Sequence, residues 1–137
     1  MNDLDQFNQE RLKLLREKYP DLLKNVSIDC GMGWYDILDT LLTTIVAVFN
    51  GHSRNIKCLH ITQIKEKFGG LRFYYGVSGD LEDKTLDNIV AQIDGAIRLA
   101  EVLASRICEV CGEKGSHDTS GWSAVLCDKH KQDRHTL

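Results

Sequence analysis

The sequence predicts an α+β fold with N-terminal helices, a β-hairpin, a long amphipathic helix and a small cysteine-containing C-terminal module. Three observations support this prediction. Apolar residues recur at helical spacing on both sides of the chain's middle, residues around a glycine pair alternate as strand residues do, and three of the five cysteines lie near the end. We therefore expect an α+β core domain over residues 1–107 and a small module over residues 108–137 packed on it.

The composition is that of an ordinary globular protein. Of the 137 residues 42% are hydrophobic and 27% are charged, which is too apolar for a disordered chain. The net charge of −3 excludes a uniformly basic nucleic-acid coat, although it leaves room for a local basic patch. The longest uncharged apolar stretch, residues 40–49, is too short to cross a bilayer, and the acidic N-terminus lacks the features of a secretory signal. We expect a soluble, cytoplasmic protein with no membrane partner.

Two helices are expected in the first third of the chain. Residues 3–18 begin with Asp3, which lies three positions before Gln6 as in a capping box. Residues 21–33 read as irregular chain with a glycine-rich turn. Residues 34–49 then place apolar side chains at helical spacing over several turns, which predicts the central core helix.

A β-hairpin and a long helix are expected next. Residues 56–65 are rich in β-branched side chains, and residues 71–77 alternate between apolar and other residues. Gly69 and Gly70 lie between these two strands and can supply the positive φ values that a tight reversal needs. Residues 80–107 return to helical spacing with one apolar stripe, which predicts an amphipathic helix running directly into the cysteine-containing tail.

The tail carries a metal-ligand pattern. Cys108 and Cys111 are separated by two residues, and so are Cys127 and His130. This spacing lets a tight backbone turn aim both side chains of a pair at one ion, and two such pairs supply the four ligands that tetrahedral zinc prefers. A knuckle, a short strand over residues 121–126 and a closing helix resemble a treble-clef or zinc-ribbon module. Because four protein ligands leave no open position, we expect structural Zn²⁺ and no catalytic residues.

Alternatives remain open for this site. An iron–sulfur cluster uses similar ligands. His135 in place of His130 would also close the coordination sphere, and His117 is a further spare histidine. Of the remaining cysteines, Cys58 is expected to be a small buried residue in a strand and Cys30 to be unreactive.

The second candidate site is a basic and aromatic cluster around the glycine pair. The residues expected to bind a partner are Lys65, Lys67, Phe68, Gly69, Gly70, Arg72 and Tyr74. Such a cluster could instead hold a phosphate or stack a base, but one turn offers far fewer contacts than tight DNA binding requires. Phe68 could also plug the core, in which case its replacement by alanine would cost about 3–5 kcal/mol of folding free energy.

Three segments carry a resemblance to a known family. Residues 63–74, the turn at residues 30–34 and the later Cys-x-x-Cys-Gly, Gly-Trp and Leu-Cys-x-x-His pattern resemble small uncharacterised proteins of phages, prophages and proteobacteria. The similarity spans roughly residues 19–130. It implies zinc binding and a mobile-element setting, but no activity. Since small phage accessory proteins often bind a host protein, the resemblance implies a non-enzymatic interaction protein that acts as an inhibitor or adaptor, including of host defence.

Two other functions are alternatives to that of an interaction protein. The first is a nucleic-acid-binding zinc module that combines the hairpin turn with basic residues around the zinc site, namely Arg106, Lys114, Lys129, Lys131 and Arg134. The second is a ββα-metal nuclease, suggested by His117-Asp118, although the histidines do not fall at a spacing that assigns a second metal.

Overall fold

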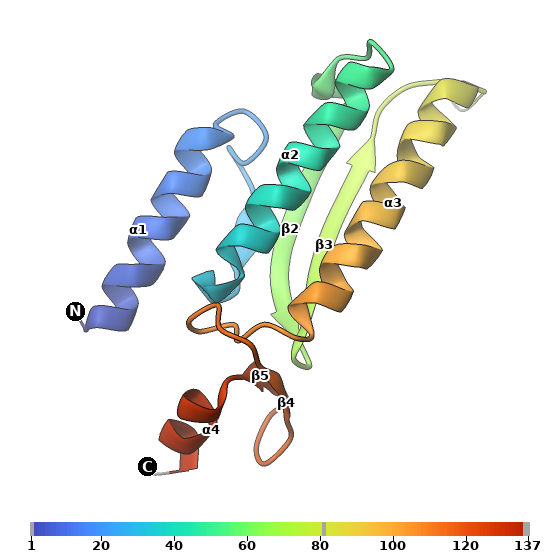
Figure 1. Ribbon diagram of the computed structural model, residues 1–137. Coiled ribbons are helices and arrows are strands. Elements are labelled where there is room, and N and C mark those ends of the chain that lie inside the picture. Colours follow the sequence, from blue (N-terminus) through green and yellow to red (C-terminus); the bar gives the residue numbers. More distant parts are fainter. Residues whose placement is uncertain (1, 81, 136–137) are drawn as a thin grey trace.

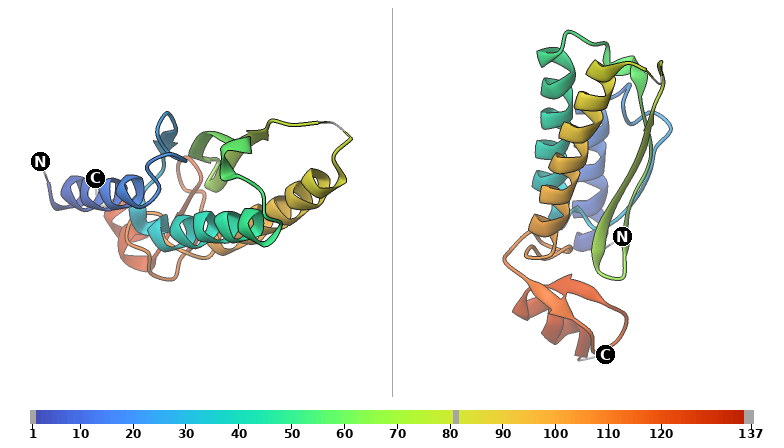
Figure 2. Two further views of the ribbon diagram at one scale, coloured as in Figure 1. Left: turned by 90° about the horizontal axis from the view of Figure 1, so that it is seen from above. Right: turned by 90° about the vertical axis from the view of Figure 1, so that its right-hand side faces the viewer.

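The computed structural model describes residues 2–80 and 82–135, without the side chain of His135, and it confirms the α+β class. Three helices lie on the same side of a three-stranded sheet, and the C-terminal module lies at one end of this two-layer core (Figures 1 and 2). The helices of the core are α1 (Asp3–Lys18), α2 (Tyr35–Gly51) and α3 (Lys84–Ala104), and its strands are β1 (Ser27–Asp29), β2 (Leu59–Lys67) and β3 (Gly70–Val77).

Helix α1 has the bounds that the sequence predicts, but its cap differs. Asn2, not Asp3, precedes the helix, and its side-chain oxygen accepts a hydrogen bond of 2.8 Å from the backbone N–H of Asp5. An asparagine in extended conformation can reach the free N–H groups of the first turn. The predicted cap was therefore placed one residue too late.

Helix α2 is the core helix predicted over residues 34–49, and a 3₁₀ turn, η1 (Met32–Trp34), leads into it. Leu38, Leu42, Ile45 and Phe49 are fully buried against the sheet and the other helices. Together, η1 and α2 form a helical segment, Met32–Gly51, that is long and apolar enough to cross a membrane. Because its apolar side chains fill the core, this segment has the features of the central helix of a globular domain.

The predicted hairpin is present, with β2 antiparallel to β3. Lys67 pairs with Gly70, so the two-residue loop consists of Phe68 and Gly69, whose φ angles are 53° and 82°. Two consecutive left-handed residues define a type I′ turn. The expectation of positive φ angles at both Gly69 and Gly70 is therefore wrong. The two positive φ angles belong to Phe68 and Gly69, and Gly70 is the first residue of β3.

Strand β1 lies inside the stretch that the sequence predicts to be irregular. It pairs in parallel with β2, with Ile28 opposite Ile64, and completes the sheet order β1-β2-β3. Before β2, the chain forms a second 3₁₀ turn, η2 (Ile56–Cys58). The sequence predicts Cys58 in a strand, but it lies in this turn.

Helix α3 is shorter than the predicted 80–107 at both ends. Asp83 caps it by accepting hydrogen bonds from the backbone N–H groups of Thr85 and Leu86. The module that follows consists of β4 (Ser116–Asp118), β5 (Ala124–Leu126) and α4 (Asp128–His135), in the strand-and-helix order expected of a treble-clef-like module. The predicted strand over residues 121–126 contracts to Ala124–Leu126, because the β4–β5 pairing ends at Asp118 and Ala124.

Candidate metal centre

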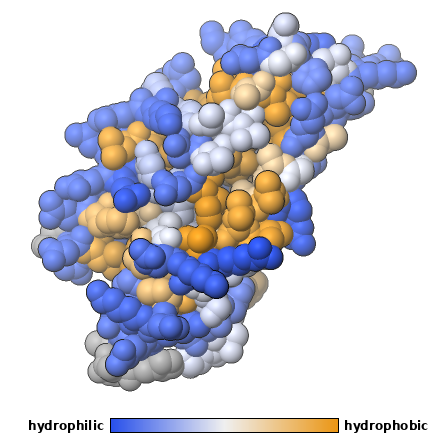
Figure 3. Space-filling model, viewed as in Figure 1, coloured by the Kyte–Doolittle hydropathy of each residue, from blue (hydrophilic) through white to orange (hydrophobic). Residues whose placement is uncertain are grey.

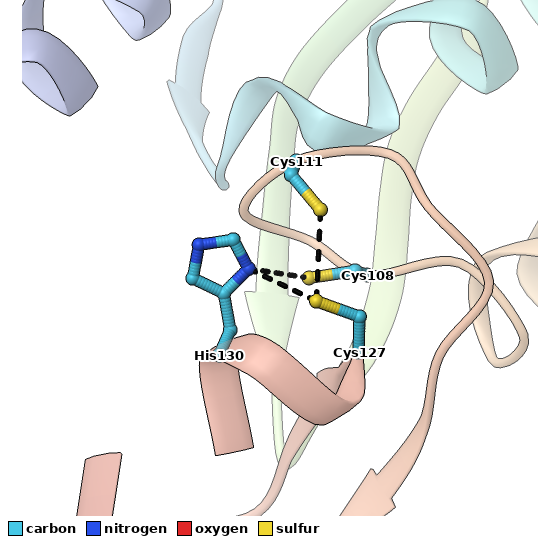
Figure 4. A group of neighbouring side chains, drawn as sticks. All are labelled: Cys108, Cys111, Cys127 and His130. Atoms are coloured by element: carbon cyan, nitrogen blue, oxygen red, sulfur yellow. Dashed lines mark hydrogen bonds between the residues drawn. The ribbon is translucent and has the colours of Figure 1, made fainter. Parts of the chain in front are cut away.

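The four predicted ligands come together in the C-terminal module. Cys108 and Cys111 lie in the loop after α3, Cys127 immediately precedes α4, and His130 lies in the first turn of α4. The three sulfur atoms and the imidazole ring point toward one another (Figure 4). Their potential ligand atoms all lie within 4.8 Å of one another. This arrangement could hold a metal ion.

The separations fit a tetrahedral ion. Sγ of Cys111 lies 3.7 Å from Sγ of Cys127, and Nδ1 of His130 lies 3.1 Å from Sγ of Cys127 and 3.5 Å from Sγ of Cys108. A tetrahedron with metal–sulfur bonds of about 2.3 Å has edges of roughly 3.8 Å, so a zinc ion would need only small adjustments. Four protein ligands would then satisfy the ion and leave no position for water.

Backbone hydrogen bonds shape the first ligand pair. The N–H of Gly112 donates to the carbonyl of Cys108 at 2.9 Å, and the N–H of Cys108 donates to the carbonyl of Glu113 at 2.7 Å. Gly112 has a φ of 85°, a conformation that glycine adopts without strain. This knuckle lets the chain fold back after Cys111 while both thiols of the pair stay on the ligand side.

Without a bound metal, the protein environment shifts the pKa values of Cys111 and Cys127 in opposite directions. Burial raises the pKa of Cys111 to about 11. Burial also opposes ionisation of Cys127, but hydrogen bonds from the backbone and the ring of His130 outweigh it and lower its pKa to about 7. Because metals bind thiolates, an arriving ion finds a substantial share of Cys127 already ionised near neutral pH, but it must displace the proton of Cys111.

Zinc affinity is therefore expected to rise with pH. Below pH 11 the metal-free Cys111 keeps its proton, so the apparent affinity should increase at least tenfold per pH unit between about pH 6 and pH 9. Competition with a chelator of known protonation constants would measure this slope. A Cys58→Ser variant should give the same slope, and an affinity that does not change with pH would contradict displacement of the Cys111 proton.

The knuckle is attached to the core through the glycine-rich turn that leads into η1. The N–H of Gly33 donates to the carbonyl of Glu109 at 2.8 Å, and the N–H of Gly31 donates to the Glu109 carboxylate at 2.7 Å. The indole N–H of Trp34 donates to the carbonyl of Ile107 at 2.9 Å. A Cβ at Gly31 or Gly33 would overlap backbone atoms of the knuckle. The two glycines thus let the core backbone approach the metal-binding loop closely.

The other cysteines and histidines lie elsewhere. Burial raises the pKa of Cys30 to about 12, so this thiol stays protonated at neutral pH. Nε2 of His117 lies 3.5 Å from the carbonyl oxygen of Phe68, and His117 is not a member of the metal-ligand cluster. The side chain of His135 lies outside the described residues, and the described cluster contains His130.

The predicted hairpin cluster divides into two surfaces. Lys65 and Arg72 are cross-strand partners on the sheet face that points away from the helices, and Tyr74 is exposed on the same face. Nζ of Lys65 lies 5.8 Å from the ring centroid of Tyr74. These three side chains form a basic and aromatic strip on the sheet, separate from the turn itself.

The turn of the hairpin presents Phe68. This side chain is 75% exposed, with Nζ of Lys67 lying 5.7 Å from its ring centroid. The alternative in which Phe68 plugs the core is therefore wrong. Gly69, in contrast, is buried against the module, and a Cβ there would lie 2.6 Å from Nε2 of His117 and 3.3 Å from the backbone nitrogen of Ala124.

Trp122 is a candidate functional residue that sequence reasoning missed. It lies in the β4–β5 loop, is 81% exposed, and has the guanidinium carbon of Arg134 5.0 Å from its ring centroid. Arg134 also donates to the carbonyl of Trp122 and forms an ion pair of 3.3 Å with Asp118. A tryptophan flanked by glycine and serine in a short loop is the sequence signal that could have indicated exposure.

The described structure thus combines a metal-ligand cluster with two highly exposed aromatic side chains, Phe68 and Trp122, and a less exposed one, Tyr74. Gly69 of the hairpin turn lies close to His117 of β4 and to Ala124, the first residue of β5, so the turn packs against these two strands. Comparison of the chain with protein-family models, with curated proteins and with solved structures gives no match.

Proposed function

We propose that this chain is a non-enzymatic interaction protein that carries structural zinc and binds a host-cell protein through an aromatic tip. The aromatic tip consists of Phe68 and Trp122. The basic side chain of Lys67 lies beside Phe68 on the turn, and Lys65 and Arg72 lie on the sheet face of the same hairpin. The zinc ion's role is to hold the β4–β5 loop, and with it Trp122, next to the hairpin turn.

The observation that carries this proposal is the conformation of Phe68. A type I′ turn favours asparagine or glycine at its first position, and a bulky residue with a φ of 53° is strained there. The strain is not repaid by burial, because the phenyl ring is 75% exposed. Exposed aromatic residues that a protein maintains at a local cost are typical of binding anchors.

The ligand chemistry supports zinc as the ion. Three thiolates and one imidazole are the soft and borderline ligands of structural zinc sites, and their separations fit tetrahedral coordination. The module has only a small apolar cluster around Cys108, Ala124 and Leu126 among its described residues. A structural ion therefore supplies the stability that this cluster lacks.

The setting of the proposal follows the family resemblance of the sequence. In an accessory protein of a phage or another mobile element, the partner would be a protein of the host cell. Aromatic anchors flanked by lysine and arginine suit a protein surface with an apolar pocket and an acidic rim.

Replacement of Phe68 tests the proposal by separating binding from stability. Phe68→Asn should raise the free energy of unfolding by about 0.5–1 kcal/mol, because asparagine tolerates the left-handed conformation. The same variant and Trp122→Ala should each lose most of the captured partner, since truncating an anchor costs about 2 kcal/mol or more of binding free energy. Thermal melting and quantitative affinity capture from host lysate would measure the two effects.

Leu14→Ala is the matched control, because Leu14 is an exposed apolar residue on α1. It should capture the same partner as the wild-type chain. Partner loss after nuclease treatment, with binding that weakens steeply as salt increases, would instead support the nucleic-acid-binding rival. Equal capture by the Phe68 and Trp122 variants and the wild-type chain would show that the aromatic tip is not the binding surface.

A further inference from the structure

Helices α2 and α3 share an outer face that no described part of the chain covers. The two helices run antiparallel, and apolar side chains gather on this face between their lower halves (Figures 1 and 3). A groove of about 250 Å³ lies there, and its lining includes Ile37, Thr40 and Thr44 from α2 and Ala96, Leu99 and Leu103 from α3. Leu99 is 61% exposed and Leu103 is 43% exposed.

The face is free of charge along most of its length. On α2 the outward positions recur every three or four residues from Ile37 to Val48, and on α3 they recur from Asn88 to Leu103. None of these positions is charged, although 27% of the chain is. The outward residues are Ile37, Thr40, Thr44 and Val48, together with Asn88, Gln92, Ala96, Leu99 and Leu103. Asp36, at one end of the groove, is the one charged residue among those that line it in the described structure.

We infer that this outer face of α2 and α3 binds a second copy of the same chain, which makes the protein a homodimer. In a twofold dimer the same surface lies on both sides of the contact, so it must be complementary to itself. A face whose one charged groove residue, Asp36, lies at its end meets this condition, because no like charges are brought together along the rest of the face. A partner selected by charge would leave acidic or basic residues on the face.

The shape of the face is also complementary to itself. Leu99 projects from α3 beside a groove that is lined mainly by apolar and small side chains. In a twofold arrangement, Leu99 of each protomer can enter the groove of the other, while Gly95 and Ala96 let the two α3 backbones approach closely. The groove is smaller than the pockets of roughly 300–1,000 Å³ that take small molecules. It is therefore better suited to a protruding side chain than to a small ligand.

The size of the face is sufficient for a dimer. Helix α2 has 17 residues and α3 has 21. At 1.5 Å per residue and about 10 Å per helix width, the pair presents a footprint on the order of 500 Å², so two protomers bury about 1,000 Å². This reaches the lower limit of about 1,000 Å² for a specific interface. In the dimer, α2 and α3 of the two protomers would form a four-helix layer. This layer would lie on the side of each core opposite to its three-stranded sheet.

Dimerisation is independent of the proposed function, because the aromatic tip lies on the hairpin and the β4–β5 loop and not on this face. A dimer would carry two aromatic tips. Phe68→Asn, which removes an anchor of the tip, is therefore expected to leave the oligomeric state unchanged.

Sedimentation velocity of the full zinc-loaded chain at about 1–100 μM tests the inference, since interfaces of this size often have micromolar affinity. The wild-type chain should sediment as a dimer at the upper end of this range. Leu99→Glu should sediment as a monomer throughout, because its carboxylate would be buried against the apolar groove of the other protomer. Thr44→Lys, on the other wall of the groove, should weaken the dimer at least tenfold.

Leu14→Glu provides the matched control, because Leu14 is 54% exposed on α1 and lies outside the face. It should remain dimeric, and circular dichroism should show all variants folded. A wild-type chain that stays monomeric at 100 μM would overturn the inference, and so would equal dissociation of the Leu14 and Leu99 variants. Flotation of the wild-type chain, but not Leu99→Glu, with phosphatidylglycerol vesicles while it stays monomeric would assign the face to lipid instead.

Discussion

Replacing Cys127 by serine is expected to abolish metal binding and to unfold the C-terminal module while the core helices persist. Elemental analysis should find about one zinc per chain in the wild-type protein and almost none in the variant, because the four ligands define one site. The apparent free energy of zinc binding in small structural sites is about 10 kcal/mol or more. The few buried apolar side chains of the module cannot replace this contribution.

Hydrogen exchange should show where the effect stops. Residues of β4, β5 and α4 should lose protection, whereas α2 and α3 should keep theirs, since the main core contains the sheet and all three long helices. The turn from Gly31 to Trp34 should exchange faster, because its N–H groups donate to Ile107 and Glu109. Chelation of the wild-type protein should give the same pattern.

Cys58→Ser is the matched control, because Cys58 is a free thiol outside the metal-ligand cluster. It should retain about one zinc per chain. A Cys127→Ser protein with full zinc content would remove this residue from the ligand set. Loss of all helical signal upon chelation would mean that the core depends on the metal and that the boundary between residues 107 and 108 does not separate two folding units.

The elements that sequence periodicity predicts well are those that bury a regular apolar face. Helix α1 has the predicted bounds, and α2, α3 and the hairpin differ from prediction by a few residues at their ends. The ligand set could also be recognised, because a metal site requires fixed residue types at fixed spacing. Strand β1 was missed, since three residues carry no detectable period and its pairing with β2 spans more than thirty positions.

The remaining errors arise from contacts between segments far apart in sequence. Nothing local indicates that Gly69 lies against His117 of the module. This contact restricts the position to glycine in addition to its φ of 82°. Likewise, residues 121–126 have the composition of a strand, but β5 can extend only as far as β4 provides a partner. Trp122 is therefore left in an exposed loop.

Replacing Gly33 by alanine is also expected to have a large effect. It should weaken the packing of the metal-binding module on the core and lower the Tm of the protein. A Cβ at this position would overlap the carbonyl oxygens of Cys108 and Glu109, which are backbone atoms that cannot move without disturbing the ligand loop. Overpacking of this kind costs about 1–3 kcal/mol, and the loss of the Gly33–Glu109 hydrogen bond adds about 1 kcal/mol. We therefore expect a decrease in Tm of roughly 6–12 °C.

Gly51→Ala is the matched control, because a Cβ at Gly51 would meet nothing within 4 Å. Alanine near the end of α2 should leave Tm unchanged or raise it slightly, since alanine has the higher helix propensity. Gly33→Ala should still bind about one zinc per chain, because none of the four ligands is altered, so calorimetry and elemental analysis together separate weakened attachment from a damaged metal site. Equal Tm values for the two alanine variants would mean that the knuckle does not pack on this turn. In that case α3 and the contact of Gly69 with His117 and Ala124 would hold the metal-binding module on the core.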